Sequence, residues 1–315
     1  MPDKRLIALA VALAAASAFF MFYGLGSGNR GFILGLRSSR LATLLVVAVA
    51  IALATMMFQT VSANRILTPS IMGFDALYLL MQTALVFFLG PVGFVALGTE
   101  AKFLTETAIM IVAALALFGT LLGRGRIDIH RMILAGVIFG VLFRSLSVFL
   151  QRLIDPNAFA VVQGASFARF SAVNGPLLWL AAAVLGLAAL VIWRMVPVLD
   201  VLALGRATAI NLGLRQRLAS LGVLTLIAVL VAVSTALVGP VAFFGLLVSA
   251  LAHALMKTHR HALLLPAAAM IAGLVLVLGQ TLFERLLNLQ STLSVIVEFV
   301  GGLFFIWLLL KGRVR

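Results

Sequence analysis

Ten long apolar stretches, separated by short polar gaps, run along the whole chain. An apolar run of about 17–25 residues is long enough for one helix to cross a bilayer. Gly and Pro recur inside or beside the runs, which predicts kinks and broken helices, because neighbouring membrane helices can satisfy the freed backbone groups. The pattern predicts an all-α polytopic membrane protein, a single domain over residues 1–315, with spans at about 5–23, 41–58, 71–92, 103–122, 131–151, 173–195, 216–237, 240–256, 262–284 and 292–310.

The first apolar stretch has two readings. Lys4 and Arg5 precede it, and Ala16-Ser17-Ala18 resembles a signal-peptide cleavage site. The stretch remains apolar as far as Tyr23, however, and no soluble mature domain follows it. We therefore expect a retained membrane span.

Composition supports a membrane protein. Hydrophobic residues make up 64% of the chain and charged residues 10%, whereas soluble domains have about 45–50% and about 25%. The chain has no cysteine, which excludes disulfides and thiolate metal sites.

The net charge of +14 does not indicate a nucleic-acid partner, because the basic residues are scattered among loops instead of forming one basic face. If both termini are cytoplasmic, about two-thirds of the Lys and Arg residues fall on cytoplasmic loops, as the positive-inside rule requires. We expect cytoplasmic N and C termini, a surrounding of membrane lipid, and no nucleic acid.

Two charged residues are expected inside spans. Arg144 lies in the fifth apolar stretch and Glu298 in the tenth. Charges within a membrane are costly and usually face a cavity or a partner. Either the two line a polar pathway or pair with other charges, or Arg144 extends to the interface and Glu298 lies near it. Gly136 and Gly140 have the GxxxG spacing that favours close helix packing.

Arg37 and Arg40 stand on the side opposite to most basic residues, at the start of the second span. Residues three apart share one face of a helix. The pair either extends to lipid phosphates or binds carboxylates of a partner, for which the guanidinium fork is suited.

Enzyme chemistry has little support. His259 and His261 are two apart and have no acidic or thiol ligand beside them, so no metal site is expected. The chain lacks the GxxxxGK[ST] phosphate-binding motif, so ATP must be bound by another subunit. The acids form no recognisable acid–base pair. We expect no catalytic residue and no cofactor.

The longest polar interval in the second half includes residues 199–213. Its helical periodicity is broken by Gly205 and stopped by Gly213, which predicts two short helices at the cytoplasmic surface. The alternative is an interfacial loop without a partner.

Several segments, in order, resemble the signatures of one family. The stretch from Gln59 through Asn64-Arg65-Ile66-Leu67-Thr68-Pro69 to Gly73 resembles "Q…NPLA-P-x-x-LG". Further resemblances are Arg37-Ser38-Ser39-Arg40 to "R-x-P-R", Leu134-Ala135-Gly136 to "LLAG", Gly239-Pro240-Val241-Ala242-Phe243-Phe244-Gly245-Leu246 to "GPIAFVGL", His259-Arg260 with Leu263-Leu264-Leu265-Pro266 to "DHR-x-LLP", and Phe304-Phe305-Ile306-Trp307-Leu308-Leu309-Leu310-Lys311 to "PFFLWLLLK".

These motifs identify the chain as similar to the FecCD family of ATP-binding-cassette permeases, which import ferric siderophores, haem and cobalamin, and most of all to its FatC/CeuC branch. Ser39 replaces the family's proline. Leu247-Val248-Ser249-Ala250 replaces "LVVPH", so the helix after Gly245 is expected to be less sharply broken than in cobalamin permeases.

The resemblance implies a BtuC-like type II importer permease in the inner membrane of a bacterium. The implied partners are ATPase subunits, a second permease subunit, with a heterodimer favoured, and an extracytoplasmic siderophore-binding protein. The implied cargo is an iron–siderophore complex, with catechol-containing siderophores favoured and haem or cobalamin as the alternative.

The resemblance also assigns roles to residues. It implies ATPase coupling through Gly205, Ala209, Leu212 and Gly213, binding-protein docking through Arg37, Arg40 and Arg285, and a pathway lined by the helices that carry Arg144 and Glu298.

Two rival classes have sequence criteria of their own. An ion-coupled secondary transporter should repeat broken helices with intramembrane acids at corresponding places, and Glu298 is the one good candidate here. An integral membrane enzyme should gather several His or Asp residues at one membrane face.

Overall fold

The computed structural model describes residues 2–25, 29–121, 129–170, 175–286 and 293–310, and within these ranges every regular element is a helix. The elements are α1 Pro2–Phe22, α2 Arg30–Ser62, η1 Pro69–Met72, α3 Phe74–Ala96, α4 Thr99–Leu121, α5 Ile129–Gln151, α6 Pro156–Ala165, α7 Gly175–Ala203, α8 Arg206–Asn211, α9 Gln216–Val238, α10 Phe244–Met256, α11 His261–Thr281, η2 Leu282–Leu286 and α12 Leu293–Leu310.

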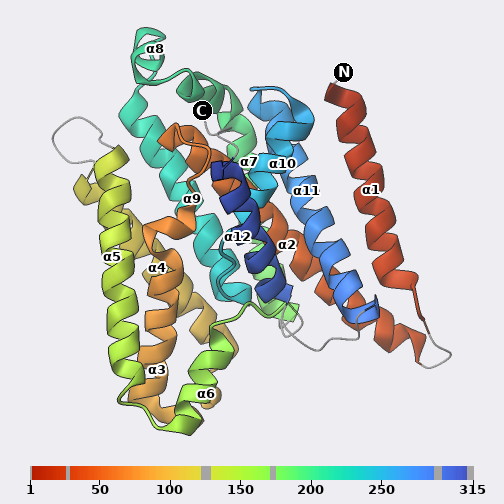
Figure 1. Ribbon diagram of the computed structural model, residues 1–315, viewed down its shortest axis with the longest axis vertical. Coiled ribbons are helices and arrows are strands. Elements are labelled where there is room, and N and C mark those ends of the chain that lie inside the picture. The colour runs from red at the N-terminus through yellow and green to blue at the C-terminus, as the bar shows by residue number, and fades with distance from the viewer. Residues whose placement is uncertain (1, 26–28, 122–128, 171–174, 287–292, 311–315) are drawn as a thin grey trace.

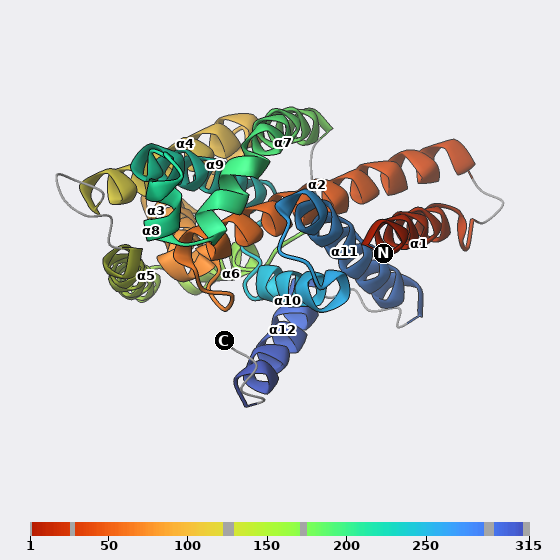
Figure 2. The ribbon, with the colours of Figure 1, turned by 90° about the horizontal axis from the view of Figure 1, so that it is seen from above.

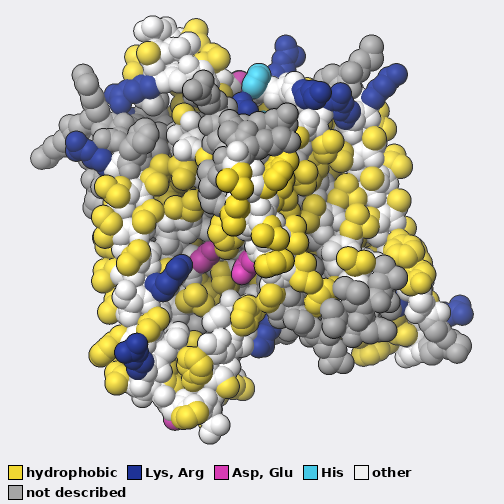
Figure 3. All heavy atoms as spheres, in the orientation of Figure 1, with side chains coloured by type: hydrophobic (Ala, Val, Ile, Leu, Met, Phe, Trp, Pro, Cys, Tyr) yellow, Lys and Arg dark blue, Asp and Glu magenta, His cyan; other side chains and the backbone are white. Residues whose placement is uncertain are grey.

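The predicted all-α membrane architecture is confirmed. Within the described ranges, eight helices are long and apolar enough to cross a membrane, and α10 and α12 contain shorter apolar helices. Together these ten correspond to the ten apolar stretches. Figure 3 shows hydrophobic side chains covering the middle of the visible face, with most of the basic side chains gathered along its upper edge.

The helices are arranged around a central group of three. The apolar windows of α2, α9 and α11 are the most buried, whereas those of α1 and α5 are largely exposed. We call the two ends of the molecule the α8 end and the α6 end, after the short helices that lie there (Figure 1). Helix α1 begins near the α8 end, and helix α12 ends toward it. Figure 2 shows α12 standing away from the body, beside α10.

The expected helix break before α3 is present. Gly73 has φ +87°, which separates the short 3₁₀ turn η1 from α3. A Cβ atom on Gly73 would lie 2.9 Å from the Cα of Gly140, and one on Gly136 would lie 2.9 Å from the Cα of Met72. The GxxxG pair therefore lets α5 pack closely against this break, as its spacing predicted.

A second break separates α9 from α10. Gly239 has φ +104° and Pro240 follows it, so the helix begins only at Phe244, later than the predicted residue 240. The 13 residues of α10 span about 20 Å, less than the roughly 30 Å of the hydrocarbon core. The non-helical residues 239–243 provide the remaining length. From Phe244 to Met256 the helix is continuous.

Helix α2 begins earlier than predicted, at Arg30 instead of residue 41. Its 33 residues correspond to about 50 Å, which exceeds the hydrocarbon thickness. The Asn29 side chain accepts a hydrogen bond from the Phe32 N–H at 3.3 Å and caps the first turn. Three arginines, two glycines and two serines interrupt the apolar residues between 30 and 40, so hydropathy missed the start of this helix.

Candidate functional site

The coupling segment, residues 199–213, contains one short helix instead of the two predicted. Helix α7 continues through Pro197 to Ala203 because Leu199 and Leu202 are buried against the rest of the chain. Gly205, with φ +89°, ends this run and precedes α8, and Gly213, with φ +81°, follows it. Both glycines adopt a left-handed backbone that favours glycine, so the two predicted breakpoints are confirmed.

The side chains of α8 divide into two sets. Ala209 is fully buried, and its carbonyl oxygen accepts the Leu214 N–H at 3.0 Å. Its small side chain therefore packs α8 against its own chain, and its part in ATPase coupling stays a prediction. Leu212 is 61% exposed, Leu204 is 60% exposed and Ile210 is 50% exposed. A partner can reach these three apolar side chains of the segment.

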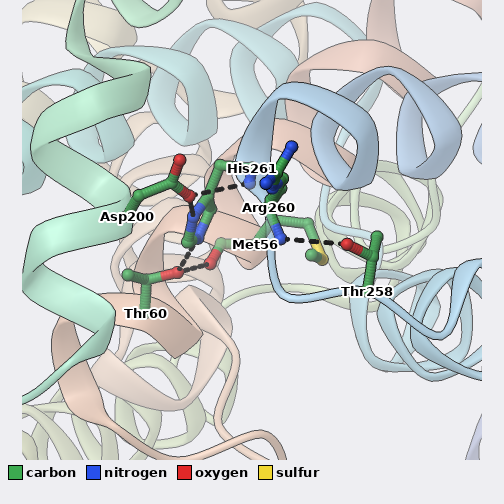
Figure 4. Close-up of polar contacts among 6 residues, drawn as sticks. All are labelled: Met56, Thr60, Asp200, Thr258, Arg260 and His261. Atoms are coloured by element: carbon green, nitrogen blue, oxygen red, sulfur yellow. Dashed lines mark hydrogen bonds and ion pairs between the residues drawn. The ribbon is translucent and has the colours of Figure 1, made fainter.

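A polar network joins the end of α7 to two other helices, as Figure 4 shows. The carboxylate Oδ1 of Asp200 accepts the backbone N–H of His261 at 2.8 Å and lies 2.7 Å from His261 Nδ1. The opposite ring nitrogen of His261 lies 2.7 Å from Thr60 Oγ1, near the end of α2. The His261 residue is 4% exposed. We call Asp200, His261 and Thr60 the polar joint.

A cavity of about 680 Å³ lies beside this network at the α8 end. Its wall includes the end of α2, the last turns of α7, and the loop between α10 and α11. Four basic or potentially basic side chains line it in addition to the polar joint: Arg65, His253, His259 and Arg260.

Arg37 lies inside the protein, not on its surface. It is 6% exposed, and its guanidinium donates to the carbonyl oxygens of Met21 at 2.6 Å, Tyr23 at 2.9 Å and Gly24 at 3.3 Å. The last carbonyls of a helix have no partner within the helix. Arg37 donates to carbonyls at and just after the end of α1 and so has a structural role; that it also docks a partner stays a prediction.

Arg40 remains at the surface. Its side chain is 37% exposed, and its Nη1 lies 3.1 Å from Glu284 Oε1 in η2. The Gln280 side chain also donates to this carboxylate oxygen. Arg285 follows in η2, but its side chain lies outside the part of the protein that the structure describes.

The two predicted intramembrane charges lie on helices at the edge of the molecule. Arg144 is exposed on α5 and Glu298 is half-buried on α12. A third charged residue, Asp75, lies in the first turn of α3 and interacts electrostatically with both. Figure 3 shows acidic and basic side chains interrupting the apolar face beside α5 and α12. The sequence did not reveal that Asp75 belongs to this group.

Other acids have local structural partners. Glu106 is 3% exposed, accepts the Gln82 amide at 2.8 Å, and lies 3.8 Å from Lys102 Nζ. Asp155 caps α6 by accepting the N–H groups of Asn157 and Ala158. Among the described residues, no group of three or more His, Asp or Glu side chains is arranged to hold a metal ion.

Sequence reasoning missed the polar joint. Asp200 was inside the predicted coupling segment and His261 beside an expected span, but 61 positions separate them. An Asp and a His at the ends of two apolar runs were the available signal. Their contact depends on how the helices pack, which the periodicity of each helix does not specify.

Comparison with known protein families matches residues 5–311 to the FecCD transport family. The chain is 44% identical over 313 residues to the petrobactin import system permease protein YclO of Bacillus subtilis, covering 99% of this chain and 98% of the relative. It is 30% identical to the petrobactin permease protein FatC of Bacillus anthracis, covering 87% and 77%. The vitamin B12 permease protein BtuC of Klebsiella pneumoniae is 29% identical, with coverage of 90% and 84%.

A solved structure has the same fold. A chain described as an inward-facing conformation of a metal-chelate type ABC transporter superposes with a TM-score of 0.85 at 22% identity, covering 99% of this chain and 100% of that one.

Replacing Arg37 by Gln should destabilise the protein far more than replacing Arg40 by Gln. The first change leaves carbonyl oxygens at the end of α1 without a charged donor, at a cost of about 1–3 kcal/mol. The second removes a half-exposed ion pair, worth about 0–1 kcal/mol. Thermal unfolding of the purified variants in detergent measures the difference. Equal shifts in Tm would contradict the structural role of Arg37.

Proposed function

The chain belongs to the FecCD transport family, and we propose from this that it is the permease subunit of an ATP-driven importer for an iron–siderophore complex. The observation that carries the proposal is the 44% identity to a petrobactin import permease across nearly the full length of both chains. A second petrobactin permease is 30% identical. We therefore propose petrobactin, or a siderophore of its class, as the cargo, and haem or cobalamin as the less favoured alternative.

The permease subunit forms no covalent bond with its cargo in this proposal. The ATPase subunits seat against α8 through the exposed Leu212 and Ile210, and Gly205 and Gly213 set the angles at which the coupling segment enters and leaves α8. Closure of the ATPases around ATP moves the coupling segment. The helices then alternate between outward and inward openings as rigid bodies.

A second permease subunit covers the face that carries α5 and α12. Arg144 is exposed there, and a charge in the membrane is costly unless it faces water, a cavity or a partner. We propose that Arg144 and Glu298, with Asp75, line the pathway between the two subunits. The similarity to the FatC branch favours a heterodimer.

The orientation in this proposal places the α8 end in the cytoplasm and the α6 end outside. Both termini are then cytoplasmic, and the bias of the basic residues follows the positive-inside rule. The binding protein docks at the α6 end, with Arg40 as one contact and Arg285 as a second. Arg37 supports this surface by fixing the turn between α1 and α2.

The cargo assignment is tested with the complete importer, reconstituted from this chain, its partner permease, the ATPase and the binding protein. We expect ATP-dependent uptake of labelled ferric petrobactin to exceed that of a ferric hydroxamate or cobalamin by about tenfold or more, equivalent to at least about 1.4 kcal/mol of discrimination. Faster uptake of cobalamin or haem would contradict the assignment.

Replacing Leu212 by Asp should uncouple ATP hydrolysis from transport. A carboxylate in an apolar contact must be desolvated, so we expect the cargo moved per ATP to fall by about tenfold. Leu212→Met preserves an apolar contact and serves as the matched control. If Leu212→Asp transports as the wild type does, α8 is not seated through this residue.

Replacing Arg40 by Glu should weaken binding of the extracytoplasmic protein, because the change reverses the charge offered to its carboxylates. We expect the Kd to rise by about tenfold. Arg30→Glu, at an exposed position on the same helix, is the control. Binding of the purified binding protein to importer in nanodiscs gives the Kd, and an unchanged value for Arg40→Glu would remove Arg40 from the docking surface.

A further inference from the structure

The polar joint connects the coupling segment to the two most closely packed central helices. Asp200 lies in the last turns of α7, a few residues before Gly205. A displacement of α8 therefore reaches Asp200 through the short turn at Leu204 and Gly205 and the last residues of α7. His261 is the first residue of α11, and Thr60 lies in the last turn of α2. The imidazole of His261 therefore links α11 to α2 and to Asp200.

The hydrogen bonds hold His261 between two other helices. Its backbone N–H and its Nδ1 both contact the Asp200 carboxylate of α7, at 2.8 Å and 2.7 Å. Its Nε2 lies 2.7 Å from the hydroxyl of Thr60, which is also 2.9 Å from the Met56 carbonyl oxygen in α2. Hydrogen bonds to a carboxylate are shorter and roughly twice as strong as neutral ones.

The other titratable side chains that line the cavity belong to two arginines and two histidines. Arg65 follows α2, His253 lies on α10, and His259 and Arg260 precede α11. Asp200 on α7 is the acidic side chain among the residues lining this cavity. Within this lining, His261 therefore has the Asp200 carboxylate as its one acidic partner.

The same two helices are joined again at the opposite end. Arg40 on α2 pairs with Glu284 in η2, which follows α11, at 3.1 Å. Twenty residues of α2 between Arg40 and Thr60 correspond to about 30 Å, the thickness of the hydrocarbon core. Polar contacts therefore join α2 and α11 at both membrane faces, with a buried apolar contact between them.

The contacts at the two ends differ from the packing in between. Apolar packing is non-directional, so helices held by it alone can slide past one another. Hydrogen bonds have preferred lengths and angles, so they set a defined position of one helix against the other. The cavity of about 680 Å³ beside the joint leaves the end of α7 room to move while these bonds hold.

We propose that His261, held between Asp200 and Thr60, is a positioning residue that transmits movement of the coupling segment to α2 and α11. These two helices then move as one unit, joined at their other ends by the Arg40–Glu284 pair. The inference rests on the proposed function, because it assumes that an ATPase moves the coupling segment.

The test breaks the joint at either side of His261 in the complete importer. Thr60→Val removes the hydroxyl while preserving the shape of the side chain, Asp200→Ala removes the carboxylate, and Thr60→Ser restores the hydroxyl. Thr225→Val is the matched control, since that hydroxyl donates to the Leu221 carbonyl oxygen of its own helix at 2.9 Å. Cargo moved per ATP hydrolysed, complex assembly and Tm are measured for each.

Thr60→Val and Asp200→Ala should each lower the cargo moved per ATP by about tenfold, with assembly and ATP hydrolysis retained. Thr60→Ser and Thr225→Val should behave as the wild type. The double variant should be no worse than the more affected single variant, because one broken link already interrupts transmission. Wild-type coupling in Thr60→Val, or a parallel loss of assembly and Tm, would overturn the inference.

The wild type separates the two proposals. If the wild-type importer takes up no chelate with ATP, the proposed function fails and the inference falls with it. If the wild type transports and the variants remain coupled, the inference alone fails. Amide hydrogen exchange gives a readout without cargo: ATPase binding should alter exchange in residues 56–62 and 261–266 of the wild type but not of Thr60→Val. Identical changes in both would also overturn it.

Discussion

A lipid bilayer offers no hydrogen-bond partner to a polypeptide, and this constraint decides where the chain can depart from a helix. The breaks at residues 66–73 and 239–243 are both largely buried by protein. They meet at a small cavity lined by Thr68 and Ser70 from one and Val241 and Phe243 from the other. The irregular backbone is thus enclosed by α2, α5, α9 and α12, and the packing of these helices depends on that enclosure.

The same constraint separates the working surfaces from the membrane-embedded body. Polar side chains at the α8 end join the coupling segment to α2 and α11, and polar side chains at the α6 end join these helices again. Between these ends, α2 and α11 pack through apolar side chains. This arrangement agrees with our proposal that an ATPase partner displaces the subunit.

Hydropathy and the Gly and Pro positions predicted the ten apolar helices and the breaks at Gly73, Gly205 and Gly239, and the resemblance of several motifs indicated the family. They did not predict the early start of α2, because Arg30, Gly31 and the run from Gly35 to Arg40 interrupt its hydropathy. Arg37 was expected at the surface, since its sequence position does not reveal that the carbonyls at the end of α1 lie beside it. The burial of Ala209 and the polar joint were missed for a similar reason: the direction of a side chain depends on tertiary packing.

The central claim is that this subunit moves cargo only when ATP hydrolysis in a partner displaces its coupling segment. The most direct measurement is accumulation of labelled ferric siderophore in proteoliposomes containing either the complete importer or this chain alone. We predict accumulation by the complete importer with ATP, unchanged when proton and sodium gradients are abolished, and none by the chain alone. Accumulation by the chain alone, driven by an ion gradient without ATP, would contradict the account.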